Sequence, residues 1–151
     1  MQNGRNDNRI TVIVEKEFGA SAEFIFNAWL DKAFLAQWMF GPHVRDEEIL
    51  ELENYPEPGG TFSYLVKRGE HVINHLGTYL EIVPHKRLVF TWGVDVEAGA
   101  DSVVSIEIER RSSGCTLRLV HDMDIKWAEY AERTKDGWSY MLSLLSQLHF
   151  N

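Results

Sequence analysis

The chain has 151 residues, 44% of them hydrophobic and 12% aromatic, so it can bury one sizeable core and is expected to form one domain. Its 15 basic and 23 acidic residues give a net charge of −8, which repels polyanions and argues against nucleic acid as a partner. The single cysteine, Cys115, excludes an internal disulfide framework and is expected to be a buried thiol in a reducing compartment. No stretch approaches the roughly 20 apolar residues of a membrane span, and the polar start lacks a secretory signal, so we predict a cytoplasmic protein.

The N-terminal part of the chain predicts one strand followed by two short helices. Residues 1–9 are polar and are expected to form a flexible arm, which leaves residues 10–151 as a single domain. The β-branched run 10–17 is typical of a strand. Ser21 and Asp31 are suited to cap two short helices, and the second helix should end at Gly41-Pro42.

Beyond Gly41-Pro42 the hydrophobic pattern has a period of two, which indicates strands. The predicted strands are 48–53, 61–67, 72–83, 88–92, 102–110 and 115–122. The connections between them are short, including the turn-rich segments 56–60 and 97–101, so consecutive strands must be antiparallel. With the first strand they predict a curved, seven-stranded antiparallel sheet and an α+β fold.

The chain is expected to end in one amphipathic helix from about residue 128 to 149. At ~1.5 Å per residue this helix would be roughly 33 Å long, enough to cross the sheet. Its internal Gly137 indicates either a close approach of another backbone or simply a weaker helix. A curved sheet wrapped around one long helix tends to leave a hollow, and hollows lined with aromatic residues bind small molecules.

Motifs that would identify a catalytic or cofactor site are absent from the sequence. It has no nucleophile elbow, dinucleotide fingerprint, phosphate loop or cysteine pair for zinc, so no cofactor and no metal are predicted. His71 and His75 would lie about 13 Å apart on an extended strand, too far to share an ion, and are expected at the surface or rim. The acidic run 46–48 is expected to be a solvated strand edge.

His121 is the most informative polar residue. Strand parity places it on the same side as Cys115, Leu117 and Leu119, so we expect it to face inward, with Asp122 pointing the opposite way. In an apolar pocket a histidine could orient a polar group or act as a general base. The alternative is a histidine at the edge of the core that bonds to backbone.

The order and spacing of several short motifs resemble the START-like, or SRPBCC, superfamily, in the branch similar to the C-terminal domain of activators of the heat-shock chaperone ATPase (AHSA-type). The resemblance covers about residues 10–150. It rests on Phe18-Gly19-Ala20, Phe26-Asn27-Ala28-Trp29, Leu35-Ala36-Gln37-Trp38, Pro58-Gly59-Gly60-Thr61-Phe62, Gly77-Thr78-Tyr79-Leu80-Glu81-Ile82-Val83-Pro84, Arg87-Leu88-Val89-Phe90-Thr91-Trp92, Leu117-Arg118-Leu119-Val120-His121 and Gly137-Trp138.

This resemblance implies a helix-grip fold with a deep hydrophobic cavity between the sheet and the C-terminal helix. Members of the superfamily bind lipids, hormones, polyketides or aromatic compounds, and some catalyse cyclisation or hydrolysis. Together with the inward-facing aromatic and polar residues, it gives the candidate ligand-binding residues Trp38, Phe62, Tyr64, Thr78, Phe90, Trp92, His121, Trp138 and Met141.

Three functions follow as expectations. The first is binding of a small hydrophobic or aromatic molecule in the internal cavity, held by aromatic rings and oriented by Tyr64 and His121. The second is an enzyme of cyclase or hydrolase type that uses His121 as acid or base. The third is a chaperone-interaction module, although only about nine residues precede the first predicted strand, which leaves no room for a companion domain. Pairing of an edge strand across a two-fold axis would make a homodimer.

Overall fold

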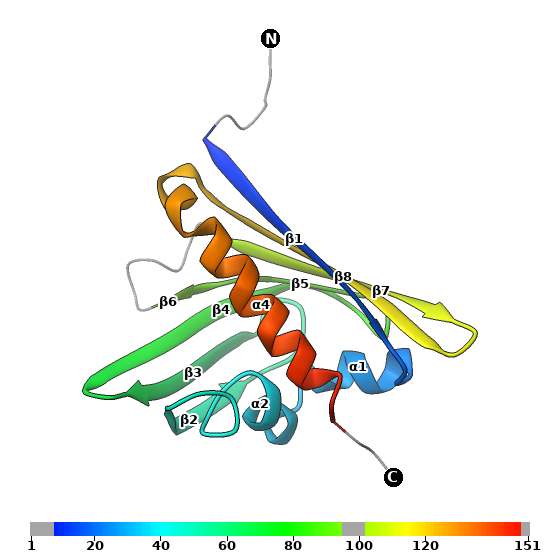
Figure 1. Cartoon of the computed structure of the whole chain (residues 1–151), viewed down its shortest axis with the longest axis horizontal. Coiled ribbons are helices and arrows are strands. Elements are labelled where there is room, and N and C mark those ends of the chain that lie inside the picture. The colour runs from blue at the N-terminus through cyan, green and yellow to red at the C-terminus, as the bar shows by residue number, and fades with distance from the viewer. Residues whose placement is uncertain (1–7, 95–101, 149–151) are drawn as a thin grey trace.

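The computed structural model describes residues 8–94 and 102–148, in which one long helix lies across one face of a curved antiparallel sheet (Figure 1). Of the predicted arm 1–9, residues 1–7 lie outside the described residues, and Arg9 belongs to the first strand. The predicted loop 97–101 and the end of the predicted helix at residue 149 also lie outside them. In chain order the elements are β1 (Arg9–Phe18), α1 (Ala22–Ala28), α2 (Lys32–Trp38), β2 (Glu48–Asn54), β3 (Thr61–Arg68), β4 (His71–Val83), β5 (Arg87–Thr91), β6 (Gly93–Val94), β7 (Val103–Arg111), β8 (Gly114–Asp124), the 3₁₀ helix η1 (Ile125–Tyr130) and α4 (Ala131–Leu145).

The predicted helix-grip architecture is confirmed. The strands run in the order β1-β8-β7-β5-β4-β3-β2, and each neighbouring pair is antiparallel. The eighth strand is β6, which pairs with β4 at His75 and Leu76, so it continues β5 along the same partner after a break at Trp92. That break was missed from the sequence because Trp92 keeps the apolar alternation of β5.

The two short helices form where the sequence places them, between β1 and β2. Ser21 accepts the Phe24 backbone N–H on its hydroxyl at 3.1 Å, and Asp31 accepts the Ala33 N–H at 2.8 Å, so both predicted caps are confirmed. Neither these helices nor α4, nor any other described helix, is long and apolar enough to cross a membrane.

The predicted C-terminal helix is confirmed, but its first predicted turn, residues 128–130, is 3₁₀ and not α-helical. Asp124 accepts the Lys126 N–H at 2.9 Å and begins a 3₁₀ segment, and the α-helix begins only at Ala131. It has 15 residues and is therefore about 22 Å long. The predicted start is early by about one helical turn, because the 3₁₀ segment runs into the α-helix without a break.

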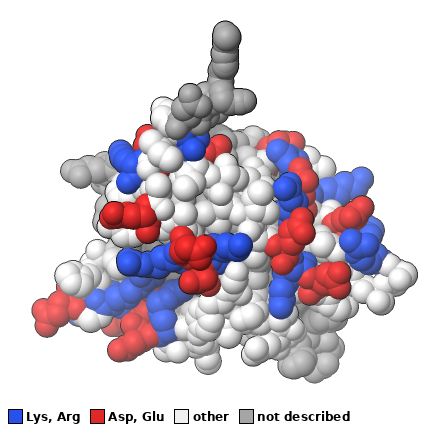
Figure 2. Space-filling view, turned by 45° about the horizontal axis from the view of Figure 1, so that its top comes forward, with Lys and Arg blue, Asp and Glu red and all other residues white. Residues whose placement is uncertain are grey.

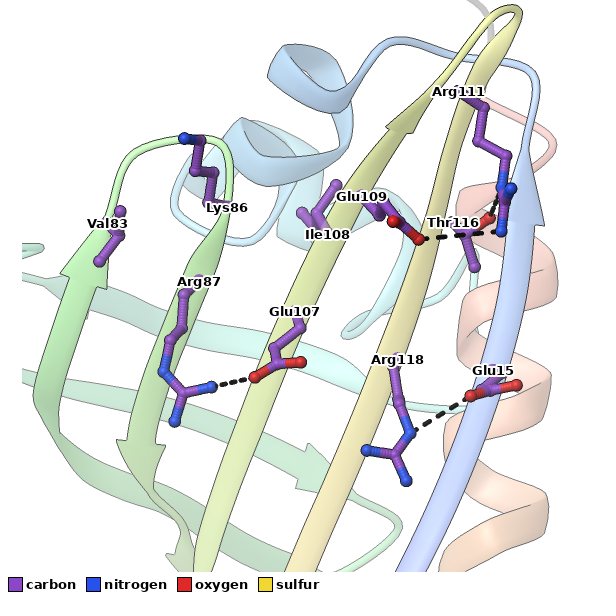
Figure 3. A pocket seen from close by; sticks show the side chains of 10 residues that line it. All are labelled: Glu15, Val83, Lys86, Arg87, Glu107, Ile108, Glu109, Arg111, Thr116 and Arg118. Atoms are coloured by element: carbon purple, nitrogen blue, oxygen red, sulfur yellow. Dashed lines mark hydrogen bonds and ion pairs between the residues drawn. The ribbon is translucent and has the colours of Figure 1, made fainter.

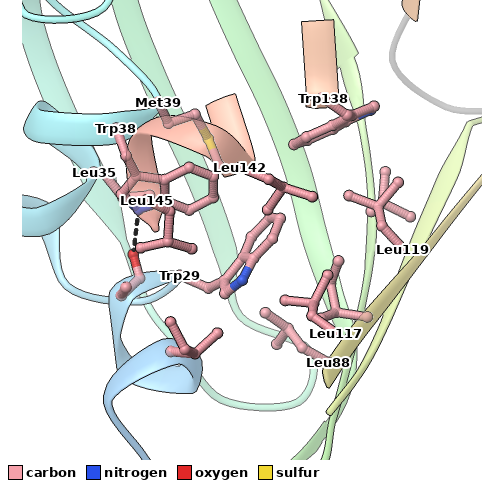
Figure 4. Packing of buried hydrophobic residues seen from close by; sticks show 14 of the residues in the cluster. Trp29, Leu35, Trp38, Met39, Leu88, Leu117, Leu119, Trp138, Leu142 and Leu145 are labelled. Carbon is pink, nitrogen blue, oxygen red and sulfur yellow. Dashed lines mark hydrogen bonds between the residues drawn. The ribbon is translucent and has the colours of Figure 1, made fainter. Parts of the chain in front are cut away.

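The inner face of the sheet and α4 enclose the core. Along β8 the side chains alternate, with Leu117, Leu119, His121 and Met123 buried and Arg118 exposed. Opposite them, α4 contributes Trp138, Leu142 and Leu145, and Figure 4 shows these side chains packed around Trp29, which follows α1, and Trp38 of α2. Cys115 is buried in the same layer, as predicted.

The acidic run 46–48 is not uniformly solvated, which corrects the prediction for Glu47. Its side chain is 0% exposed, and it contacts Arg45 at 3.2 Å and Arg68 at 2.5 Å. Its carboxylate also accepts the Gly41 backbone N–H at 2.7 Å. The run crosses from a loop into β2, so Glu47 turns inward while Glu48, the next residue, is exposed.

Gly137 provides a direct test of helix propensity. A Cβ built on it meets nothing within 4 Å, which excludes the close backbone approach that the sequence left open. Gly137→Ala should therefore raise the free energy of unfolding by about 0.5–1 kcal/mol, because alanine loses less backbone entropy in a helix. Urea denaturation measures this change in the free energy of unfolding. Gly77→Ala is the opposite case, because a Cβ at that position would lie 2.2 Å from the Phe62 ring, so this variant should be less stable than the wild type. A loss of stability in Gly137→Ala would contradict the finding that the space beside Gly137 is open.

Candidate ligand-binding pocket

The space between the sheet and the helices is almost full, which corrects the predicted deep internal cavity. The enclosed space measures only about 10 Å³, which is about the least that can hold one water molecule. It is lined by Trp29, Leu35, Met39, Phe62, Tyr64, Tyr79, Leu88, Phe90 and Trp92. The aromatic rings that were expected to line a hollow pack on one another instead: the Phe62 and Tyr64 rings stack at 4.9 Å, and Phe62 meets Phe90 edge-on at 5.7 Å.

The polar groups of this inner space are mostly paired with protein. The Asn54 amide donates to the Leu30 carbonyl at 2.8 Å and to the Tyr79 hydroxyl at 3.4 Å, which lies 3.3 Å from the Tyr64 hydroxyl. Burial raises the pKa of both tyrosines, so both hydroxyls stay protonated. Among the described residues, Trp29 Nε1 is the one buried side-chain polar atom without a hydrogen-bond partner.

A larger pocket of about 240 Å³ opens beside this packed interior, between β6, β8 and the segment that joins β8 to α4. It is lined by Trp92, Gly93, Val94, Ser102, His121, Met123, Trp127, Tyr130 and Thr134. Trp92 lines both spaces, and its ring lies 5.6 Å from the Trp138 ring and 5.9 Å from that of Phe62. Trp92 is therefore the wall between the pocket and the packed interior.

Local backbone geometry positions the floor of this pocket. Where the chain leaves β5, the Trp92 N–H donates to the Ser102 carbonyl at 2.8 Å, and this bond holds Ser102 at the start of β7. In the register of β7 and β8, Val104 lies opposite His121, two residues from Ser102. The exposed wall comes from η1, where the Trp127 and Tyr130 rings lie 5.8 Å apart. Arg133 stacks on Tyr130 at 5.2 Å.

Three side chains form a buried relay beneath the pocket. Trp138 Nε1 donates to His121 Nδ1 at 3.0 Å, and His121 Nε2 lies 2.5 Å from the Ser102 hydroxyl. Because an indole nitrogen can only donate, Nδ1 must be the unprotonated nitrogen of the imidazole. The proton of the neutral ring is therefore on Nε2, and the Ser102 oxygen accepts it.

The electrostatic surroundings of His121 favour the neutral ring that this tautomer requires. Burial lowers the pKa of His121 to about 4, against a smaller opposing effect of Asp122, so the ring is neutral at pH 7. A second proton on Nδ1 would also face the Trp138 N–H. The lone pair of Nδ1 accepts the indole proton of Trp138, and Nε2 carries the proton of the neutral ring. The imidazole therefore has no free lone pair that faces the pocket. This arrangement does not support His121 as a general base.

The structure separates the predicted site residues into groups. Trp92 and His121 line the open pocket, and Trp138 lies behind His121. Phe62, Tyr64 and Phe90 line the small inner space, and Trp38 is a core residue that donates to the Ala28 carbonyl at 3.0 Å. Met141 packs at the edge of the core and lines neither space.

Thr78 lies on the other side of the sheet from the predicted cavity. Its neighbour Gly77 pairs with the inward-facing Phe62, whereas Thr78 pairs with the exposed Thr61. The side chains of β4 that face inward are those of His75 and Tyr79. The sequence prediction assigned the alternation of this strand one residue out of step, and so placed Thr78 on the wrong face.

His75 is also corrected, because it is buried and not at the surface or rim. Its ring lies 5.0 Å from Phe40 and 5.4 Å from Trp92, and burial lowers its pKa to about 4. His71 is exposed as predicted. The two differ because β4 is 13 residues long, and only its later part lies beneath the helices. The described residues contain no group of His, Cys, Asp or Glu that could hold a metal ion.

Sequence reasoning missed most of the residues that line the open pocket: Ser102, Met123, Trp127, Tyr130 and Thr134. The available signal was the segment 125–130, which has three large apolar side chains outside any strand or helical period. Ser102 has no such signal, because its role depends on its contact with a residue 19 positions away.

The outer face of the sheet has a wide groove of about 650 Å³ that differs in character from the pocket. Figure 3 shows that it follows a ladder of ion pairs across the strands, with Arg87 bonded to Glu107 and Arg118 to Glu15. Acidic and basic residues are likewise interspersed on the face in Figure 2. Charges that cancel in exposed pairs give a groove little selectivity for a charged partner.

Comparisons with known proteins agree with this fold. No curated protein matches the chain. Solved structures that resemble it include protein CV1439 from Chromobacterium violaceum, with 24% identity, a TM-score of 0.78, and coverage of 90% of this chain and 94% of that one. Protein SA2116 from Staphylococcus aureus, of unknown function, has 22% identity, a TM-score of 0.78 and coverage of 95% and 94%. CalU16 from Micromonospora echinospora has 21% identity, a TM-score of 0.67 and coverage of 89% and 73%.

These identities establish a shared fold and no more. The family described as "Activator of Hsp90 ATPase homolog 1-like protein" matches residues 19–149, which include both short helices, the sheet from β2 onward and α4. The match covers most of the chain and all of the residues that line the open pocket or form its relay. The chain therefore belongs to the activator of Hsp90 ATPase homolog 1-like family.

Proposed function

We propose that this protein reversibly binds a small, largely apolar ring compound in the open pocket, without transforming it. The observation that carries the proposal is the lining itself: aromatic rings of Trp92, Trp127 and Tyr130 surround a hollow of about 240 Å³ above a buried polar floor. Ligand sites are typically apolar with a few fixed polar groups, and this pocket has that composition.

The volume limits the ligand. Drug-sized molecules occupy pockets of roughly 300–1,000 Å³, so a pocket of about 240 Å³ suits a compound of one or two rings. A longer ligand would have to displace Trp92, the wall that separates the pocket from the inner space. The proposed site is thus at the mouth of the fold, not in the deep cavity that the superfamily resemblance implies.

The enzyme alternative has less support. A hydrolase or cyclase with His121 as base would need a free imidazole lone pair near the ligand, and the Trp138 and Ser102 contacts occupy both nitrogens. Ser102 also lacks an activating base, because it accepts the His121 proton. A binding role requires neither.

Binding can be tested with tetralin and 1-tetralone, two bicyclic probes of matched shape, in thermal-shift and calorimetric titrations. We expect at least one to raise the melting temperature and to bind with a measurable dissociation constant. Tyr130→Ala should weaken binding about two- to tenfold, because one aromatic wall is lost. The matched control is Tyr55→Ala, which removes an exposed tyrosine from the β2–β3 connection and should leave affinity unchanged. No binding of either probe, or equal losses in the two variants, would contradict the proposal.

A further inference from the structure

The geometry points to a more specific ligand class: an uncharged ring compound that carries a hydrogen-bond acceptor oxygen, such as a ketone, quinone or lactone carbonyl, which accepts a bond from the Ser102 hydroxyl. This inference rests on the proposed function and adds the polarity and charge of the ligand. It follows from where each proton of the Trp138–His121–Ser102 relay must lie.

The first step is a count of donors. The Ser102 oxygen accepts the Nε2 proton of His121, so its own hydroxyl proton is not used in that bond. No other hydrogen bond of this hydroxyl is present among the described residues. Ser102 lines the pocket and is only 9% exposed, so its hydroxyl proton is available to a molecule bound there. A buried donor without an acceptor is unfavourable, and a carbonyl oxygen of the ligand would satisfy it.

The second step is the direction of the relay, which Trp138 fixes. Without the indole proton on Nδ1, the imidazole could take the other tautomer and present a bare Nε2 to Ser102. The serine would then donate to histidine and offer the pocket an acceptor. Because Trp138 is 2% exposed and held in the core, the structure keeps the donating arrangement. Trp138 and His121 are thus positioning residues, and Ser102 is the residue that contacts the ligand.

The third step is charge. The buried part of the lining, Ser102, His121 and Met123, contains no cation, since the His121 ring is neutral at pH 7. The cations near the pocket, Lys126 and Arg133, stack on the Trp127 and Tyr130 rings in the exposed segment. A carboxylate at the floor would lose its hydration for one neutral hydrogen bond, whereas a carbonyl loses much less. The floor therefore selects a neutral acceptor.

The test compares how strongly each variant prefers 1-tetralone over tetralin, using the ratio of the two dissociation constants from calorimetry at pH 7. The wild type should bind the ketone about five- to tenfold more tightly than the hydrocarbon. Ser102→Ala should bring this ratio to about one, a five- to tenfold loss, while leaving tetralin affinity nearly unchanged. The matched control, Ser105→Ala, removes a serine that faces the other side of β7 and should leave the ratio intact. The anion 1-naphthoate should bind at least tenfold more weakly than 1-tetralone.

A second variant tests the relay independently of Ser102. Trp138→Phe keeps a ring in the core and removes the indole proton, so the ketone preference should fall and the ¹⁵N signals of His121 should change from the Nε2-protonated form to a mixture of tautomers. A purely structural role of Trp138 would weaken both probes equally and leave the tautomer unchanged, which would overturn the inference.

The remaining outcomes separate the two proposals. Equal affinity for ketone and hydrocarbon in the wild type, an unchanged ratio in Ser102→Ala, or tighter binding of 1-naphthoate would overturn the ligand class and leave the binding function standing. If none of the three probes binds, the proposed function fails and the inference fails with it.

Discussion

Lowering the pH from 7 to 5 is expected to remove about 4 kcal/mol from the free energy of unfolding, because two buried histidines resist protonation. Burial lowers the pKa of His75 and of His121 to about 4, from an ordinary value of 6.5. Below pH 6.5 the unfolded chain takes up both protons, while the folded chain does not, so stability is full above pH 6.5 and falls as the pH decreases toward 4. Each histidine contributes about 1.4 kcal/mol per pH unit within that range.

Urea denaturation at half-unit steps between pH 7.5 and 4.5 measures this dependence. The slope should be about 2.7 kcal/mol per pH unit below pH 6 in the wild type, and about half of that in His75→Phe, whose ring suits the contacts with Phe40 and Trp92. Arg45, Glu47 and Arg68 are the charged groups that act on His75. His71→Gln is the control, since solvent surrounds that side chain in both states. A free energy of unfolding that stays constant between pH 7 and 5 would contradict the burial of these rings.

Removal of the Glu47 charge should have an effect of similar size. Glu47→Gln is expected to destabilise the fold by about 3 kcal/mol, because it leaves the Arg45 and Arg68 guanidinium groups without their shared anion. Arg45 also donates to the Met39 carbonyl at 3.0 Å, so its charge cannot simply turn to solvent. The free energy of unfolding at pH 7 checks the value.

The neighbouring Glu48 supplies the matched control for this substitution. Its side chain is exposed, so Glu48→Gln should change stability by less than about 0.5 kcal/mol. The Glu47 cluster also fixes the loop after α2, whose Val44 carbonyl accepts the Tyr140 hydroxyl of α4 at 2.6 Å. Equal effects of the two substitutions would show that the loop does not depend on the buried carboxylate.

The fold was predictable because its signals are local. The period of two that places Phe62, Tyr64 and Val66 on one face of β3, and the caps at Ser21 and Asp31, can be read within a few residues. Parity along β8 was enough to turn His121 inward and Asp122 outward. The same rule gave the wrong face in β4, where Thr78 was expected inside and His75 outside. A bulge after Tyr79 changes the alternation along this strand, and the length of the strand places His75 beneath the helices.

The site was only partly predictable because its contacts join distant segments. Trp92 and His121 were named from strand faces, but the partner that gives His121 its tautomer comes from α4, and its acceptor from the start of β7. The size of the internal space was the larger error. Whether Trp29, Phe62 and Phe90 enclose a hollow or fill it depends on ring orientations, which no sequence pattern specifies.

The central claim is that a ligand occupies the open pocket beside Trp92 and not the packed interior, and the five indole N–H signals of the protein in a ¹⁵N–¹H spectrum test it directly. Titration with 1-tetralone should shift the signals of Trp92 and Trp127, which line the pocket, and that of Trp138, which donates to His121, while those of Trp29 and Trp38 stay in place. A saturating titration that shifts Trp29 and leaves Trp127 unchanged would place the ligand in the interior and contradict the account.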